Sequence, residues 1–422
     1  MSEWTKLQLR TLFVCFLLNM LDGADVLVVS FVAPLLTAEW NVSDAAFGVA
    51  FSSGLAGMMV GALFIAPVAD IRGRKFLILL ATVIVSVGML ASALVQSLTQ
   101  LVILRFLTGL GIGSMLASVS ALASEYAPER FRSFAVTTAI AGYPAGATLA
   151  GLAAGYVLPA FGWQGMFVLM GLISTVLLPL LWFYLPESVQ FLLARQPRNA
   201  LQLANRYLRL QSLPELQSLP VPGSKEGASP VSRLLARDLR LGTALIWAAF
   251  FSSFFTLYFL TSWIPSIGVG AGFELATAIR GSAVFNVGAF FGLVTLGWFT
   301  MRMDLAKVIG WFFLLSSVVM ALFGAWHAPV SVFYGLLLVM GFLIQGGFGG
   351  LYAVATHFYP TTARSTGVGW AIGIGRFGAI AGPLLGGFVI SAGTSLLLTF
   401  ALFAGPMLLA ALMTWLVAGQ KT

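Results

Sequence analysis

Two carboxylates, Asp22 and Asp25, lie inside a long apolar stretch of the chain. Three residues apart on a helix, they project about 60° from each other and lie roughly 4.5 Å apart along the axis, so they share one face. A charged carboxylate inside a bilayer costs several kcal/mol unless it is paired, hydrated or protonated. Repulsion between neighbouring acids favours protonation of at least one of them, which predicts a reversible proton carrier. A static ion pair that fixes helix packing is the alternative.

Two arginines also lie at depth in apolar runs. Arg105 matches the depth of Asp25, which predicts a pair that holds the carboxylate charged until a proton or substrate competes for it; a fixed salt bridge is the alternative. Arg376 lies about twelve residues beyond Arg364, in a half of the chain whose spans carry no deep acid. A guanidinium facing a cavity binds a carboxylate through two parallel hydrogen bonds. Arg376 is therefore the predicted carboxylate receptor, with a structural pairing across the halves as the alternative.

Flat or polar side chains at other positions are candidates for lining a substrate site, although each aromatic side chain also suits helix packing. The residues predicted to contact substrate beside Arg376 are Tyr143, Tyr258, Trp263, Gln345, Phe348, Tyr352 and Trp370.

A charged loop reads Asp70-Ile-Arg-Gly-Arg-Lys75. Asp70 is expected either to cap the following helix or to pair across the cytoplasmic interface, and Gly73 permits a tight turn. With Arg74 and Lys75, these residues form the predicted gate. Plain retention of positive charge on the cytoplasmic side is the alternative.

The elements that position these residues follow from composition. With 59% hydrophobic and 9% charged residues and a mean hydropathy of +0.98, the chain cannot present a water-solvated surface, so it is expected to lie in a membrane. The net charge of +8 falls in short loops, which favours a topological role over binding to nucleic acid. One cysteine, Cys15, and two histidines, His327 and His357, exclude an intramolecular disulfide and argue against a metal site or a membrane-embedded enzyme.

Apolar windows predict twelve spans, each about 20 residues or longer. They cover residues 11–36, 45–69, 76–94, 98–123, 134–158, 164–185, 241–265, 275–300, 305–326, 330–358, 365–390 and 394–417. With both termini in the cytoplasm, all but three of the 22 Lys and Arg residues fall on cytoplasmic segments. The expected domains are a six-helix bundle at 1–185, a cytoplasmic linker at 186–240 and a second six-helix bundle at 241–422.

The two halves resemble each other at an offset of 232 residues, as in the match of Pro128 and Arg132 with Pro360 and Arg364. A parallel repeat of six helices predicts a central cavity and alternating access.

The loop at 66–75 resembles the signature of the major facilitator superfamily, Gly-x-x-x-Asp-(Arg/Lys)-x-Gly-Arg-(Arg/Lys), with Ala66 and Ile71 departing from it. Its second-half copy at 297–302 has lost the acid to Met301. Within that superfamily the chain is similar to the aromatic acid/proton symporter family over nearly its whole length. The matching segments are 21–25, 105–113, 124–128, 185–188, 258–263, 359–360, 367–376 and 382–387.

This resemblance implies a proton-coupled symporter that imports a benzoate-like acid. It implies roles in coupling, gating or binding for a set that adds Glu125 to residues named above, namely Asp22, Asp25, Asp70, Arg74, Glu125 and Arg376. Phe348 and Tyr352 replace the Gln and Asn common in the family, so the acid can differ.

We therefore expect an all-α membrane protein with the major facilitator fold, twelve transmembrane helices in two six-helix halves, and both termini cytoplasmic. The proton-coupling set is Asp22, Asp25, Arg105 and Glu125. We expect a monomer in the cell membrane, driven by the proton gradient without a cofactor, metal or nucleic-acid partner. The alternatives are import of an aliphatic dicarboxylate such as muconate, and drug export by proton antiport. The absence of a Gly-Pro dipeptide in 142–146 argues against export.

Overall fold

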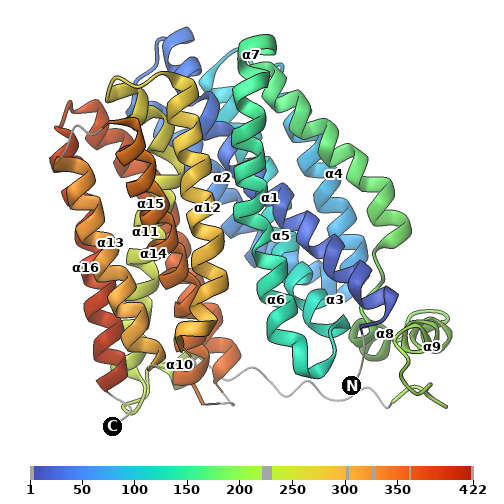
Figure 1. Cartoon of the computed structure of the whole chain (residues 1–422). Helices are drawn as coiled ribbons and strands as arrows, with labels where there is room; N and C mark the ends of the chain where they lie inside the picture. The colour runs from blue at the N-terminus through green and yellow to red at the C-terminus, as the bar shows by residue number, and fades with distance from the viewer. Residues whose placement is uncertain (1–3, 221–230, 301–303, 326–328, 361–362, 420–422) are drawn as a thin grey trace. The chain divides into compact units, whose positions relative to one another are not determined.

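The computed structural model describes residues 4–220, 231–300, 304–325, 329–360 and 363–419, and these residues form helices and loops without a β-strand (Figure 1). The helices are α1 (Lys6–Glu39), α2 (Asp44–Val60), α3 (Ala69–Arg72), α4 (Arg74–Ser92), α5 (Leu98–Tyr126), α6 (Arg132–Ile140), α7 (Gly142–Tyr184), α8 (Val189–Arg195), α9 (Ala200–Leu210), α10 (Val231–Leu234), α11 (Arg240–Gly270), α12 (Leu275–Thr300), α13 (Leu305–Ala325), α14 (Val330–Phe358), α15 (Arg364–Ser391) and α16 (Leu396–Gly419). Short π-helical and 3-10 segments, Gly61–Ile65 and Ala66–Val68, connect α2 to α3. Met301 and Arg302 of the second-half copy of the loop motif lie outside the described residues, as does His327.

Eleven helical segments of the described chain are long and apolar enough to cross a membrane. One of them, Phe134–Tyr184, has 51 residues, more than twice what a single crossing needs. Gly162 interrupts it with backbone angles of φ 64° and ψ −170°, which are accessible to glycine and not to an L-residue. Divided at Gly162, this segment supplies the predicted fifth and sixth spans. The cytoplasmic position of the termini stays a prediction.

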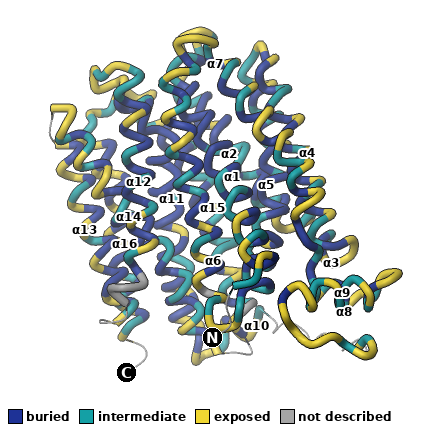
Figure 2. Tube along the Cα trace, turned by 45° about the vertical axis from the view of Figure 1, so that its right-hand side comes forward, coloured by how far each residue is buried: buried dark blue, intermediate teal, exposed yellow. Residues whose placement is uncertain are grey.

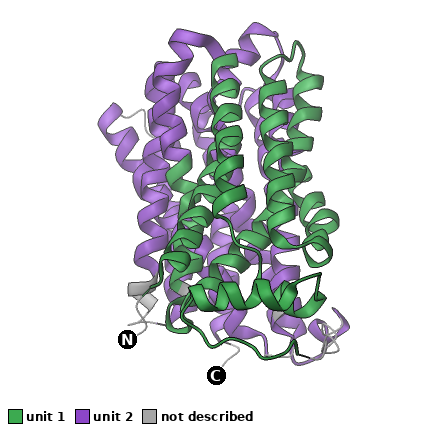
Figure 3. Ribbon diagram, turned by 90° about the vertical axis from the view of Figure 1, so that its right-hand side faces the viewer, with its two compact units in different colours: residues 1–25, 56–146, 164–226 green, residues 26–55, 147–163, 227–422 purple. Residues whose placement is uncertain are grey.

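The chain packs as two compact units that do not follow the order of the sequence (Figure 3). Unit 1 contains residues 1–25, 56–146 and 164–226, and unit 2 contains residues 26–55, 147–163 and 227–422. The predicted domains follow the internal repeat, whereas these units follow packing, so the domain boundaries stay a prediction.

The core of unit 1 joins α1, α4, α5, α6 and α7. Its buried members include Val14, Ile78, Met115 and Leu181. Between helices in lipid, close van der Waals packing and interhelical hydrogen bonds replace the hydrophobic effect as the source of association. This core therefore fixes the helices that carry the first group of candidate residues.

Unit 2 contains segments from both halves of the repeat. Ser30 Oγ donates to the carbonyl of Ser262 at 2.7 Å, and these serines are 232 residues apart, at equivalent positions of the two halves. Ser52 Oγ donates to the carbonyl of Ile380 at 2.8 Å. The hydrogen bond between the equivalent positions 30 and 262 supports the predicted parallel repeat.

Exposed residues lie along several helices (Figure 2). Many of those in unit 2 are apolar. In α16, Leu402, Leu409, Leu412 and Leu416 are each between 44% and 50% exposed. Exposed leucines spaced along one helix suit contact with lipid tails and not with water.

Candidate functional site

The acid pair lies on α1 in unit 1, where both side chains are removed from solvent. Asp22 is 3% exposed and Asp25 is 4% exposed. Arg105 of α5 is equally buried, and its Nη2 lies 3.1 Å from Asp25 Oδ1. The predicted pairing of Asp25 with Arg105 is confirmed.

Arg105 also binds the main chain of α1, in addition to the carboxylate of Asp25. Its Nη1 donates to the main-chain oxygen of Asp25 at 3.4 Å, and its Nη2 also contacts Thr108 Oγ1 and, at 3.4 Å, the sulfur of Met89. The guanidinium thus keeps hydrogen-bond partners on α1 and α5 whether or not Asp25 is charged. Protonation of Asp25 removes a Coulomb attraction at this point without leaving Arg105 isolated.

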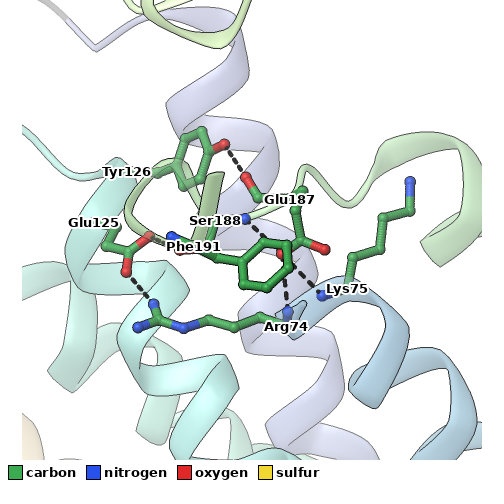
Figure 4. Close-up of polar contacts among 7 residues, drawn as sticks. All are labelled: Arg74, Lys75, Glu125, Tyr126, Glu187, Ser188 and Phe191. Atoms are coloured by element: carbon green, nitrogen blue, oxygen red, sulfur yellow. Dashed lines mark hydrogen bonds and ion pairs between the residues drawn. The ribbon is translucent and has the colours of Figure 1, made fainter. Parts of the chain in front are cut away.

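A second group of charged residues surrounds the start of α4 in unit 1 (Figure 4). Glu187 Oε1 accepts hydrogen bonds from the main-chain N–H groups of Arg74, Lys75 and Ser188 at 2.9, 3.3 and 2.7 Å. The first N–H groups of a helix lack partners within the helix and favour an anion. Glu187 is therefore the cap of α4.

Glu187 fits here because Gly73 precedes α4 with φ +100°. A Cβ at Gly73 would collide with the Glu187 carboxylate, so both the backbone angle and the space demand glycine. The tight turn predicted at Gly73 is confirmed. A carboxylate distant in sequence, that of Glu187, binds the first N–H groups of α4, and the capping role considered for Asp70 stays a prediction.

Burial raises the pKa of Glu187 above its ordinary value, and the hydrogen bonds from Ser188, Lys75 and Arg74 oppose this shift. Desolvation therefore disfavours the charged form of this carboxyl, while the N-terminus of α4 stabilises its charge.

Glu125, at the end of α5, belongs to the same group of residues. One of its oxygens pairs with Arg74 Nη1, and Ser188 Oγ donates to the other at 2.7 Å. Tyr126, the next residue, donates its hydroxyl to the main-chain oxygen of Glu187 at 2.6 Å. These contacts join the ends of α5 and α7 to the start of α4, so Glu125 lies with the predicted gate and not with Asp25.

The remaining gate residues make contacts of other kinds. Lys75 Nζ donates to the carbonyl of Trp182 at 2.6 Å. Asp70 is exposed, and its main-chain oxygen accepts from Arg195 Nε at 2.8 Å. Its predicted pairing across the cytoplasmic interface stays a prediction.

Sequence reasoning assigned no role to Glu187 or Ser188, although both lie in a segment that matched the family. The available signal was local: an acid follows the end of an apolar span directly, and Ser188 then caps α8 by accepting from the N–H of Phe191 at 3.0 Å.

Unit 2 carries a third group, in which Arg376 of α15 meets a cluster of aromatic rings. The guanidinium carbon lies 5.8 Å from the centroid of the Phe254 ring. Phe348 meets Phe254 edge-on at 4.7 Å, Tyr258 stacks on it at 5.9 Å, and Tyr352 meets Phe348 at 5.5 Å. Three predicted substrate residues therefore gather around one ring, that of Phe254, which was not predicted.

Arg376 has an unused donor at this place. Its Nη1 atom is buried and makes no hydrogen bond to any residue that the structure describes. A buried cationic donor without a partner is costly unless a ligand supplies the acceptor.

The other predicted substrate residues lie elsewhere. Trp263 is fully buried, donates its indole N–H to the carbonyl of Pro383 at 2.9 Å and packs against Phe51 at 5.1 Å. Trp370 stacks on Trp247 at 5.9 Å. These contacts give both tryptophans a packing function, and their contact with substrate stays a prediction.

Two further predicted substrate residues have less distinctive surroundings. Gln345 of α14 is 7% exposed. Tyr143 lies in unit 1, where its backbone passes so close to Gly23 that a Cβ there would overlap it. Tyr143 therefore neighbours the acid pair on α1.

A sequence model described as Major Facilitator Superfamily matches residues 15–295, about two thirds of the chain. The chain belongs to the major facilitator superfamily. It is therefore a multi-pass transporter of the cell membrane and not an enzyme.

Curated relatives confirm the narrower resemblance to the aromatic acid/proton symporter family. A gallate transporter of Pseudomonas putida is 35% identical over 95% of this chain and 90% of its own length. The 4-hydroxybenzoate transporter PcaK of Pseudomonas aeruginosa is 35% identical over 98% and 94%. The benzoate transport protein of Acinetobacter baylyi is 30% identical over 92% and 85%.

Solved structures show the major facilitator fold independently. A D-xylose-proton symporter superposes with a TM-score of 0.74 at 18% identity, covering 96% of this chain and 97% of that chain. An inward-open xylose transporter from E. coli gives a TM-score of 0.75 at 16% identity over 97% and 95%.

Proposed function

We propose that this superfamily member is a symporter that imports a small aromatic carboxylate together with protons, by alternating access. The observation that carries the proposal is the buried Nη1 of Arg376, which lacks a partner among the described residues and lies within a cluster of aromatic rings. A guanidinium supplies the donors for a carboxylate, and the rings supply flat apolar surface for an aromatic body.

The relatives support the same class of substrate. Gallate, 4-hydroxybenzoate and benzoate each place one carboxylate on one benzene ring. The Phe254 ring beside Arg376 stacks on Tyr258 and meets Phe348 edge-on, and Tyr352 in turn meets Phe348 edge-on, which is how aromatic groups prefer to meet. An aliphatic dicarboxylate has no ring to pack against these side chains, so it should bind such a site less tightly.

Proton coupling resides at the acids of α1. A buried carboxylate is stable when it is paired with a cation or protonated, and Asp25 has both options because Arg105 retains other acceptors. Protonation weakens the link between α1 and α5, so that proton binding and helix rearrangement are coupled. Asp22, one helical turn away, is the second site through which the proton passes.

The energy source in this mechanism is the proton gradient, with no bound cofactor. One copy of the chain suffices, because each copy carries both the acids and Arg376.

The residues around Glu187 and Glu125 fix the ends of α4, α5 and α7 relative to one another. A gate requires helix ends that are held together in this way.

Uptake by proteoliposomes tests the proposal. Labelled 4-hydroxybenzoate should accumulate above its external concentration when the outside is acidic, and a protonophore should abolish accumulation. If labelled muconate accumulates under the same conditions and 4-hydroxybenzoate does not, the protein is the alternative dicarboxylate importer. Loss of preloaded substrate under the same gradient identifies the exporter.

A further inference from the structure

Phe254 occupies a position that no predicted function had used. It lies in α11, is 1% exposed, and presents its ring to the guanidinium of Arg376 at 5.8 Å. A guanidinium over an aromatic ring is attracted by the negative charge of the ring face, and this attraction uses none of its N–H groups. A ring therefore holds Arg376 and leaves its hydrogen bonds available, whereas a carboxylate would consume them.

Gly375, next to Arg376, makes this approach possible. A Cβ at Gly375 would come within 2.6 Å of Phe254 Cδ2, which is closer than side-chain atoms pack. The absence of a side chain lets the ring lie against the backbone of α15. The residue before the arginine thus sets the position of the ring that supports the arginine.

Other rings fix the orientation of Phe254. Phe348 meets it edge-on, with the two rings at 71°, while Phe250 and Tyr258 stack on it at 6.3 and 5.9 Å with interplanar angles of 29° and 15°. A ring held by three neighbours cannot turn its edge, which repels cations, toward Arg376.

The internal repeat shows what the same place holds in the first half. Phe254 is 232 residues from Asp22, and Gly375 is 232 residues from Tyr143, so the equivalent positions of the first half lie on α1 and α7, where the backbone of Tyr143 passes close to Gly23. The first half carries an acid where the second half carries a ring. An acid at 254 would neutralise Arg376, whereas the ring preserves the cation for an incoming anion.

We infer that Phe254, placed by Gly375, is the positioning residue that holds the Arg376 guanidinium for the substrate carboxylate. This inference rests on the proposed function, since it assigns Phe254 to the aromatic-carboxylate site.

Stepwise fluorination of the ring tests the inference, because fluorine withdraws charge from the ring face with little change in shape. Phenylalanine with one, two and three ring fluorines is introduced at 254 by nonsense suppression, and uptake of 4-hydroxybenzoate is measured in proteoliposomes. We expect KM to rise with each fluorine, by about tenfold at three, which is the size of a cation–π contribution, with the maximal rate within twofold. The same series at Phe259, a fully buried ring of α11 that stacks on Phe403, is the matched control and should leave KM unchanged.

One ordinary substitution tests the position of the ring without changing its charge distribution: Gly375→Ala displaces the Phe254 ring and should raise KM. A KM that does not respond to fluorination at 254, or responds equally at 259, overturns the inference while the proposed function stands. If the unmodified protein accumulates no aromatic carboxylate, the proposed function fails and the inference fails with it.

Discussion

Arg105 binds both the side-chain and the main-chain oxygen of Asp25, so one guanidinium joins α5 to α1 at two points. In the membrane interior this contact is both structural and titratable. The structural part persists when Asp25 is protonated, whereas the Coulomb part does not.

Removing one member of this pair should destabilise the protein. Arg105→Gln leaves the Asp25 carboxylate without its counterpart, at a cost of about 3–5 kcal/mol, whereas Asp25→Asn resembles the protonated acid and leaves Arg105 its other acceptors, so it should cost less. The double variant should lose at least about 1 kcal/mol less than the sum of the single variants, because the residues interact directly. Unfolding in detergent, followed by tryptophan fluorescence, measures the cycle. Strict additivity would show that the two side chains do not interact.

Stability should depend on pH through Glu187. Because burial raises its pKa above the ordinary value of 4.5, Glu187 contributes stability that is present below pH 4.5 and is lost as the pH rises through the folded-state value. The Glu187→Gln variant lacks this decline, so wild-type stability relative to the variant should fall from pH 4 upward. Thermal midpoints between pH 4 and 8 measure the difference.

Glu215 provides the control of opposite sign. Its hydrogen bond to Arg209 lowers its pKa, so its contribution is present above pH 4.5 and is lost as the pH falls. Because Glu215 is exposed, the effect of Glu215→Gln should be small. A Glu187→Gln difference that rises with pH would contradict the assignment of burial as the dominant cause.

Gly73→Ala should destabilise the start of α4 for two reasons, a positive φ and a collision with Glu187. Gly272 has φ +90° and no atom near its Cβ position, so Gly272→Ala measures the cost of the backbone angle alone, about 1 kcal/mol. The excess loss at Gly73 then reports the contact with Glu187. Equal losses of stability at both positions would mean that the contact with Glu187 contributes nothing to stability.

Arg376→Lys should weaken substrate binding by at least about tenfold, because an ammonium cannot present two parallel donors to a carboxylate. Arg280→Lys, an exposed arginine of α12, is the matched control and should leave KM unchanged. An unaltered KM in Arg376→Lys would assign Arg376 to helix packing.

Sequence reasoning succeeded where depth or backbone geometry decides the outcome. Counting residues into each apolar run placed Asp25 and Arg105 at one level, and the loop composition identified Gly73 as the turn. It failed where the partner comes from a distant segment. Asp70 was the candidate cap that the loop itself offered, whereas Glu187, which was not predicted, binds the N–H of Arg74 because the chain after α7 returns to the start of α4.

Phe254 is a second residue whose role could not be predicted from the sequence. The chain contains 35 phenylalanines, and in a helix that is apolar on every side the periodicity does not tell which ring faces an arginine. The contact between Phe254 and Arg376 was found only from the structure, in which Gly375 and Arg376 lie beside the ring. The sequence did contain one signal for it, because Phe254 is at the repeat position equivalent to Asp22.

Coupled movement of protons and substrate is the central claim, and the internal pH of proteoliposomes measures it directly. With a trapped pH-sensitive dye and no imposed gradient, addition of 4-hydroxybenzoate should acidify the lumen of vesicles that contain the wild-type protein. Vesicles that contain Asp25→Asn should not acidify. Substrate uptake without acidification, or with alkalinisation, would contradict proton symport.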